Sequence, residues 1–210
     1  DRAMDHLQPS SFSDILELLP GGRASNGTLT TPNVISLREV PISGNDYATS
    51  SLGTQFVVDG APISMHANIQ RLSGALDRTS NVRNFTNMGV DMRSIATDDI
   101  QEVEIVRGIP SVKYGDLTSG LVKITRRRGG NNLSARFKAD MNSKLFYVGK
   151  GFENTAKRLS FNLSGDYLDS QSDPRNILEN YKRITLSARM NKVFETRSHQ
   201  ISTILNIDYG

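Results

Sequence analysis

The residue types that could carry out acid–base, nucleophilic or metal chemistry are few in this chain, and they are scattered. The three histidines, His6, His66 and His199, lack the spacing of metal ligands. There is no cysteine, which excludes a thiol nucleophile and a disulfide. The sequence also lacks the G-x-S-x-G, H-E-x-x-H and phosphate-binding-loop patterns of common enzymes. The adjacent carboxylates of Asp98 and Asp99 precede a strand pattern, where such pairs commonly form a turn or cap. We therefore expect no enzyme activity, no cofactor and no metal site.

Charge and hydropathy narrow the choice of partner. Among 210 residues, 25 are basic and 22 are acidic, which gives a net charge of +3. A balance this even argues against a nucleic-acid partner. There is no apolar run long enough for a transmembrane helix. Membrane-spanning strands alternate in polarity and leave only a weak hydropathy signal, so a membrane location stays open.

The stretch 98–128 has the clearest pattern in the chain. Two alternating apolar runs, at 103–107 and 121–125, predict two strands. The segment between them is too broken for a long helix, and we expect a short helix or turn over 111–114 followed by a glycine-rich loop. The residues that break this middle segment are Gly108, Pro110, Gly115 and Gly120.

Ahead of this stretch the sequence predicts one helix, two strands and a long loop. Phe12, Ile15, Leu16 and Leu19 follow helical spacing and indicate a helix with one apolar face, stopped by Pro20–Gly22. The expected strands lie at 34–40 and 55–60, the second running into a turn at Asp59–Gly60. The polar segment 64–93 is long for a loop, so it is either a mobile insertion or a functional loop.

From Leu133 onward, apolar and polar residues alternate strictly, which predicts antiparallel strands. Such segments suit a transmembrane barrel, and they also suit a soluble meander with one face on a core; periodicity alone does not separate the two. Five strands cannot close a barrel and would leave open edges. The expected strands are 133–141, 144–152 (the least regular), 159–167, 183–190 and 201–209.

The 98–128 pattern resembles the signature of TonB-dependent outer-membrane receptors, whose plug domains carry a run like I-E-x-V/I-E-V-x-R-G-P-x-S-x-x-Y-G-x-x-x-x-G-x-I-x-I-x-T. Two departures are Ile109, an extra residue before the proline, and Lys123, where asparagine is usual. Further matches are L-x-x-L-P-G at 16–21 and V-x-D-G-x-P at 57–62. The matching positions in the main run are Ile100, Glu102, Val103, Glu104, Ile105, Arg107, Gly108, Pro110, Ser111, Tyr114, Gly115, Gly120, Val122, Ile124 and Thr125.

The resemblance implies a fold class. It is an α+β plug domain with a small mixed β-sheet and short helices, followed by antiparallel β-strands of an incomplete outer-membrane β-barrel. We expect the plug at 1–130 and the first barrel strands at 131–210, so that the chain is a fragment of a Bacteroidetes-like receptor. Taken alone, residues 133–210 are expected to be disordered, paired between copies or folded in a non-native way. The family's energy-coupling box is not recognisable in the first nine residues and is expected to be missing.

The resemblance also implies a function, which is energy-coupled import across the bacterial outer membrane with the plug facing the barrel lumen and periplasm. The implied partners are a TonB-type energy-coupling protein (through the missing N-terminal segment), outer-membrane lipid around the full barrel and a small ligand. An iron chelate, cobalamin, a glycan and a peptide are all compatible. A soluble periplasmic or surface binding module with a plug-like core is the alternative. The implied ligand contacts on the apical loop are Met65, His66, Arg71, Arg78, Arg83 and Phe85, and the implied plug–barrel charge contacts are Glu102, Glu104 and Arg107.

Overall fold

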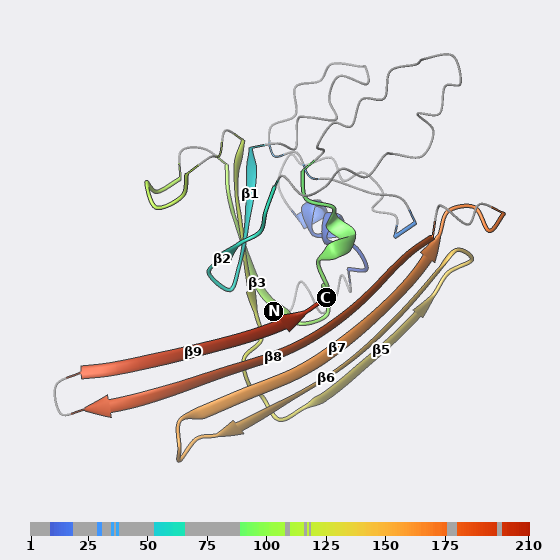
Figure 1. Cartoon of the computed structure of the whole chain (residues 1–210). Coiled ribbons are helices and arrows are strands. Elements are labelled where there is room, and N and C mark those ends of the chain that lie inside the picture. The colour runs from blue at the N-terminus through green and yellow to red at the C-terminus, as the bar shows by residue number, and fades with distance from the viewer. Residues whose placement is uncertain are drawn as a thin grey trace. The chain divides into compact units, whose positions relative to one another are not determined.

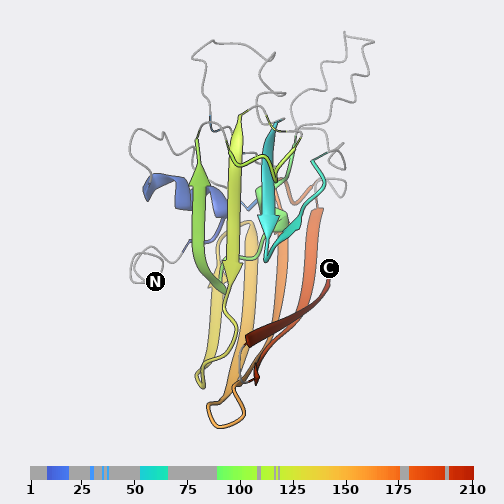
Figure 2. The same ribbon diagram turned by 90° about the vertical axis from the view of Figure 1, so that its left-hand side faces the viewer.

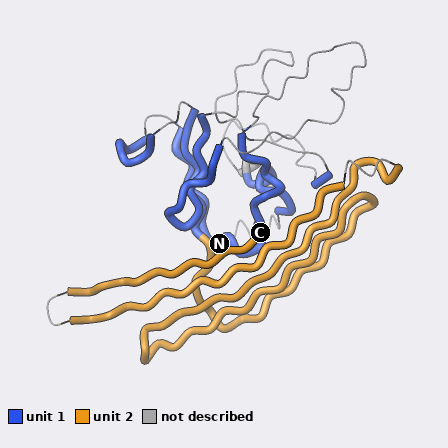
Figure 3. Tube along the Cα trace, viewed as in Figure 1, with its two compact units in different colours: residues 1–125 blue, residues 126–210 orange. Residues whose placement is uncertain are grey.

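The computed structural model divides the chain into two compact units, Asp1–Thr125 and Arg126–Gly210 (Figure 3). Each unit is built around its own β-sheet. Within the part of the chain that the structure describes, no helix is long and apolar enough to span a membrane. The described residues are 9–18, 29, 30, 35, 37, 53–65, 89–107, 110–115, 117, 119–175, 180–196 and 199–210.

A four-stranded mixed sheet forms the framework of the first unit, with strand order β2-β1-β4-β3 (Figures 1 and 2). β1 pairs in parallel with β4 and antiparallel with β2. The strands predicted on either side of the glycine-rich loop and ahead of the Asp-Gly turn are confirmed. Their bounds are Thr54–Val58 for β1, Ala61–Pro62 for β2, Ile100–Val106 for β3 and Gly120–Arg126 for β4.

Two tight turns behave as their sequences predict. Asp59 and Gly60 join β1 to β2 with φ of 50° and 92°. Positive φ at both central residues matches the right-handed twist of a hairpin, and Asp and Gly tolerate it better than other residues. The segment Ser111–Tyr114 forms a turn, in which the Tyr114 N–H donates to the Ser111 carbonyl at 3.0 Å. Of the two alternatives left open for that segment, the turn is therefore the one found.

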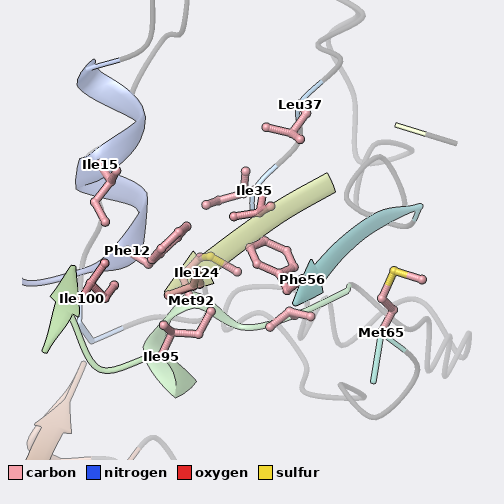
Figure 4. Packing of buried hydrophobic residues seen from close by; sticks show 12 residues of the cluster. Phe12, Ile15, Ile35, Leu37, Phe56, Met65, Met92, Ile95, Ile100 and Ile124 are labelled. Atoms are coloured by element: carbon pink, nitrogen blue, oxygen red, sulfur yellow. The ribbon is translucent and has the colours of Figure 1, made fainter. Parts of the chain in front are cut away.

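The hydrophobic core of the first unit joins the sheet to the helical segments at 12–18 and 92–94 (Figure 4). The Phe12 ring meets the Phe56 ring edge to face, with centroids 6.1 Å apart and planes at 77°. Such pairs add about 0.5–1.5 kcal/mol to the free energy gained by burial alone. The buried cluster consists of Phe12, Ile15, Ile35, Leu37, Phe56, Met65, Val90, Met92, Ile95, Ile100, Val122 and Ile124.

The helix predicted near the N terminus is a 3-10 helix, η1 (Phe12–Leu18), and not an α-helix. Phe12 and Ile15 are three residues apart and both are buried; three residues per turn places them on one side of the helix. The Asp14 carboxylate accepts two backbone N–H groups from the residues before η1, at 2.9 and 3.0 Å. Another helix among the described residues, η3 (Met92–Ser94), is also 3-10. Within the described residues, the helical part of the predicted α+β class is thus reduced to 3-10 turns.

Two further sequence predictions are partly corrected. In the expected strand 34–40, only Ile35 and Leu37 are described; both are buried in the core and neither lies in a strand. The expected polar loop 64–93 is wrong at its C-terminal end, where residues 89–93 enter the core and begin η3. The pattern was misleading there because Asp91 and Arg93 are charged and nevertheless buried. Apart from residues 64 and 65, the rest of both segments lies outside the described residues.

The second unit is a five-stranded antiparallel sheet with strand order β5-β6-β7-β8-β9 (Figure 1). All five predicted strands are confirmed. β6, expected to be the least regular, alternates between buried and exposed side chains over most of its length. β7 and β8 extend beyond their predicted ends because the alternation continues into polar residues. The bounds are Leu133–Ala139 for β5, Ser143–Asn154 for β6, Leu159–Gln171 for β7, Asn180–Thr196 for β8 and His199–Tyr209 for β9.

Candidate functional site

The three charges singled out on and after β3 are all exposed. Glu102 and Glu104 alternate with half-buried Val103 and Ile105. The Lys123 ammonium on β4 donates to the Glu104 carboxylate at 2.5 Å. This hydrogen bond raises the pKa of Lys123, and the charge of Glu102 acts in the same direction. The structure therefore brings Glu102 and Glu104 together around a lysine of the same unit.

The last of these three charges, Arg107, follows directly after β3 and is exposed. β3 is an edge strand of the four-stranded sheet, so this charged segment is not covered by another strand of that sheet. The assignment of Glu102, Glu104 and Arg107 as contacts to a barrel wall stays a prediction.

Gly120, at the start of β4, occupies a position with no room for a side chain. Its φ is 157°, and a Cβ there would lie 2.8 Å from the carbonyl oxygen of Val106 and 2.7 Å from the Leu37 side chain. The Val106 oxygen belongs to the backbone of β3 and cannot move aside without disturbing the strand pair. This crowding is the physical reason for a glycine at this point of the motif.

Replacing Gly120 with alanine is expected to destabilise the first unit by about 1–3 kcal/mol, the usual cost of forcing atoms into a packed site. Gly115 supplies a matched control from the same motif, because a Cβ there meets nothing within 4 Å. The measurement is hydrogen exchange of the β3 and β4 amides in both variants. Similar protection in Gly120→Ala and Gly115→Ala would contradict the steric explanation.

A buried ion pair that the sequence did not indicate caps η3. Asp91 and Arg93 are 5% and 3% exposed. The guanidinium donates to the carboxylate through Nη2 at 2.7 Å and through Nε at 2.9 Å. The Asp91 carboxylate also accepts the Arg93 backbone N–H at 3.0 Å. An Asp followed by a short helix is a recognisable capping signal, but nothing in the local sequence reveals that the arginine two residues later is buried.

The segment before η1 is attached to the same region. The Thr97 hydroxyl donates to the Pro9 carbonyl at 2.7 Å, and both residues are buried. Phe12, three residues after Pro9, packs in the core beside Phe56. The N-terminal segment and β1 therefore share one packed interior (Figure 4).

Alternation gives the second unit a polar face and an apolar face. On the polar face Arg189 is fully buried and donates through Nη2 to the side-chain oxygens of Asn162 at 2.7 Å and Ser164 at 3.0 Å. Arg183 forms an ion pair with buried Asp166, which lies opposite Thr185, two residues along β8 on the same face. Buried guanidinium groups are expected to be paired and hydrogen-bonded in this way.

Arg126, the first residue of the second unit, extends this polar network. Its guanidinium makes two parallel hydrogen bonds to the Asp208 carboxylate, at 2.7 and 2.6 Å. The Ser187 hydroxyl donates to the same carboxylate at 2.6 Å. The two-point geometry fixes the orientation of the Arg126 guanidinium against the Asp208 carboxylate.

The opposite surface of the sheet, here called the apolar face, carries large exposed hydrophobic side chains. The strand register arranges them in four successive rows that cross the sheet. The rows are Phe137, Phe146, Tyr167, Ile184; then Ala135, Val148, Gly165, Leu186, Tyr209; then Leu133, Lys150, Leu163, Ala188, Ile207; then Phe152, Phe161, Met190, Leu205.

Comparison with protein families decides the identity of the first unit. Residues 1–122 match the family model described as the TonB-dependent Receptor Plug Domain. The chain belongs to this family. It is a family of transport proteins and not of enzymes, and TonB-dependent receptors sit in the bacterial outer membrane. A search of curated proteins finds no match to the chain.

Solved structures with a similar fold include two receptors. One is the siderophore receptor PirA from Acinetobacter baumannii, at 18% identity and a TM-score of 0.50 over 74% of this chain. The other is a mutant of the ferric enterobactin receptor PfeA from Pseudomonas aeruginosa in complex with enterobactin, at 15% identity and 0.54 over 77%. At these identities the likeness shows the fold alone. This chain spans 23% and 26% of the length of those receptors. Neither match supports a Bacteroidetes-like source.

Of the six residues predicted to contact a ligand, the structure describes one. Met65 follows β2 and belongs to the buried core of the plug domain, with 8% of its surface exposed. His66, Arg71, Arg78, Arg83 and Phe85 lie outside the described residues. The ligand role of all six stays a prediction.

Proposed function

We propose that this chain is the gate and the opening wall of an energy-coupled outer-membrane importer. The main support for the proposal is that a plug domain is followed along the chain by antiparallel strands. These strands form a sheet with one polar and one apolar face. A soluble sheet normally covers such an apolar face with a second layer, whereas a membrane barrel turns it toward lipid. We assign residues 1–130 to the plug and 131–210 to the first barrel strands.

The dimensions of the apolar face support this assignment. Its four rows span about 20 Å along the strands at about 3.4 Å per residue, or about 14 Å along the membrane normal at a tilt of about 45°, so they fit within the apolar band of about 25 Å of outer-membrane barrels. The polar face would then line the lumen, where Glu102, Glu104 and Arg107 of the plug are proposed to meet charges of the wall. A TonB-type energy-coupling protein is the proposed partner that loosens the plug.

A ferric chelate is the ligand class that we favour. The two receptors of similar fold are named for a siderophore and for ferric enterobactin. The predicted apical loop of this chain carries Arg71, Arg78, Arg83 and Phe85. Guanidinium groups bind anionic oxygens in pairs of hydrogen bonds, and an aromatic ring adds a flat apolar contact. An anionic iron chelate offers both kinds of partner.

The test uses the complete receptor gene in a bacterial strain that lacks its own siderophore receptors. Labelled ferric catecholate, ferric hydroxamate, cobalamin and an oligosaccharide are supplied with and without the strain's TonB-type protein. Uptake of a ferric chelate only when the coupling protein is present is the expected result. Uptake without coupling, or a receptor found in the soluble fraction, would contradict the importer and favour the soluble binding module. Coupled uptake of another ligand would contradict the ferric chelate alone.

The triple variant in which Arg71, Arg78 and Arg83 are all replaced by alanine is expected to bind a ferric chelate about tenfold more weakly, or worse. The reason is that the loss of one hydrogen bond to a charged group already costs about 1.5 kcal/mol of binding free energy. The measurement is equilibrium binding to the purified receptor. Lys157→Ala is the control, since this exposed lysine lies in the tight turn between β6 and β7. Unchanged affinity in the triple variant would exclude the arginines from the ligand site.

A further inference from the structure

Lys150 is the one charged residue within the four rows of the apolar face. Leu133 and Leu163 are its cross-strand neighbours on either side. In the described residues its ammonium has no hydrogen bond and no ion pair, and its contact is the Phe152 ring, with the nitrogen 5.1 Å from the centroid. A charge on a lipid-facing surface is costly and is expected where it has a partner or a function.

The direction of the side chain shows where a partner would lie. Lys150 leans over Phe152, the next residue of the apolar face toward the β6–β7 turn. Lys192 on β8 leans the same way, with its nitrogen 5.6 Å from the Phe194 centroid. The Lys192 ammonium also donates to the Lys157 carbonyl of that turn at 2.5 Å. Two cations therefore point toward one end of the sheet.

That end of the sheet corresponds to a membrane–water boundary under the proposed function. Lys150 precedes Asn154, the last residue of β6, by four positions, or about 14 Å along the strand and about 10 Å along the membrane normal at a tilt of about 45°. A lysine stem can lie along apolar surface while its ammonium reaches the polar boundary. At that level the available anion is the phosphate of a lipid headgroup.

A groove of about 550 Å³ adjoins Lys150 on the apolar face. Its lining includes Leu163, Leu186 and Ile207. Gly165 keeps it open, because a Cβ there would lie 3.2 Å from the Leu186 side chain and occupy the floor. An apolar groove beside a cation matches the two parts of a phospholipid, the hydrocarbon chain and the phosphate.

We propose that Lys150 and this groove bind one glycerophospholipid from the membrane leaflet next to the β6–β7 turn. The phosphate accepts hydrogen bonds from the ammonium group of Lys150, and one acyl chain lies over Gly165. The site rests on the proposed function, because it requires the apolar face to be in a membrane.

The test measures lipid binding to the intact receptor, purified from the outer-membrane fraction in a non-ionic detergent, by native mass spectrometry with added phosphatidylglycerol. Lys150→Gln is expected to weaken binding about tenfold, as expected for loss of a charge-assisted contact. Lys144→Gln is the matched control, because Lys144 lies on the same face of β6 as Lys150 but at the opposite end of the strand. The affinity of this variant for phosphatidylglycerol should equal that of the wild type. Diacylglycerol, which lacks the phosphate, should bind wild type and Lys150→Gln equally.

The outcomes separate the two proposals. A receptor absent from the membrane fraction overturns both. A membrane-embedded receptor that binds phosphatidylglycerol equally with and without Lys150→Gln overturns the lipid site alone, as does an equal loss in Lys144→Gln. If Lys150→Gln instead removes a co-purifying protein and leaves phosphatidylglycerol binding unchanged, the lipid site is also overturned.

Discussion

Replacing Arg93 with alanine is expected to lower the free energy of unfolding of the plug unit by about 3–5 kcal/mol, the usual cost of breaking a buried ion pair from one side. Asp91 would keep the Arg93 backbone N–H as a donor but lose both guanidinium contacts in a buried position. The measurement is hydrogen exchange of the β1 and β4 amides in the complete receptor, which reports the free energy of local opening.

The exposed pair of Lys123 and Glu104 supplies the control for this prediction. Their side chains are 34% and 54% exposed, so water replaces the lost contact in Lys123→Ala and the exchange of β1 should hardly change. The double variant, with both Asp91 and Arg93 replaced by alanine, should lose less free energy of unfolding than the sum of the losses in the two single variants. The reason is that the double variant leaves no unpaired charge in the interior. Equal protection in Arg93→Ala and the wild type would show that the pair does not stabilise the plug.

Replacing Phe12 with alanine is expected to lower the free energy of unfolding of the plug unit by about 3–5 kcal/mol, as for other buried aromatic residues. The ring is fully buried, lies edge to face on Phe56, and connects η1 to β1. Its removal leaves a cavity where the N-terminal segment meets the sheet. Faster hydrogen exchange is expected in β1, and faster proteolysis is expected in residues 9–18.

The exposed Val112 provides the comparison for Phe12. Its side chain is 101% exposed in the turn after β3 and lies outside the core cluster, so Val112→Ala should leave exchange and proteolysis unchanged. If Phe12→Ala alters proteolysis near residue 12 but leaves the β1 amides fully protected, the N-terminal segment is not coupled to the sheet. Increased exchange in both places would establish that coupling.

Strand positions followed from the sequence because alternation is a local property. The five strands of the second unit, the two strands around the glycine-rich loop and the turn at Asp59–Gly60 were all predicted from neighbouring residues. The order of the first sheet could not be predicted in that way. β1 lies between β2 and β4, and its parallel partner comes from a distant part of the chain. The type of η1 was also wrong, because the spacing of three residues between Phe12 and Ile15 fits both an α-helix and a 3-10 helix.

The sequence by itself determined the plug motif, the alternating strands and the absence of cysteine chemistry, since each depends on residue type and local spacing. Only the tertiary structure decided which charges are buried and which are exposed. Arg93 and Arg189 are buried beside hydrogen-bond acceptors, whereas Glu104 on β3 pairs with Lys123 on the adjacent strand β4. Lys150 lies between Leu133 and Leu163 on the apolar face. The physical reason is that the environment of a charge is set by the segments that pack around it, and those segments come from elsewhere in the chain.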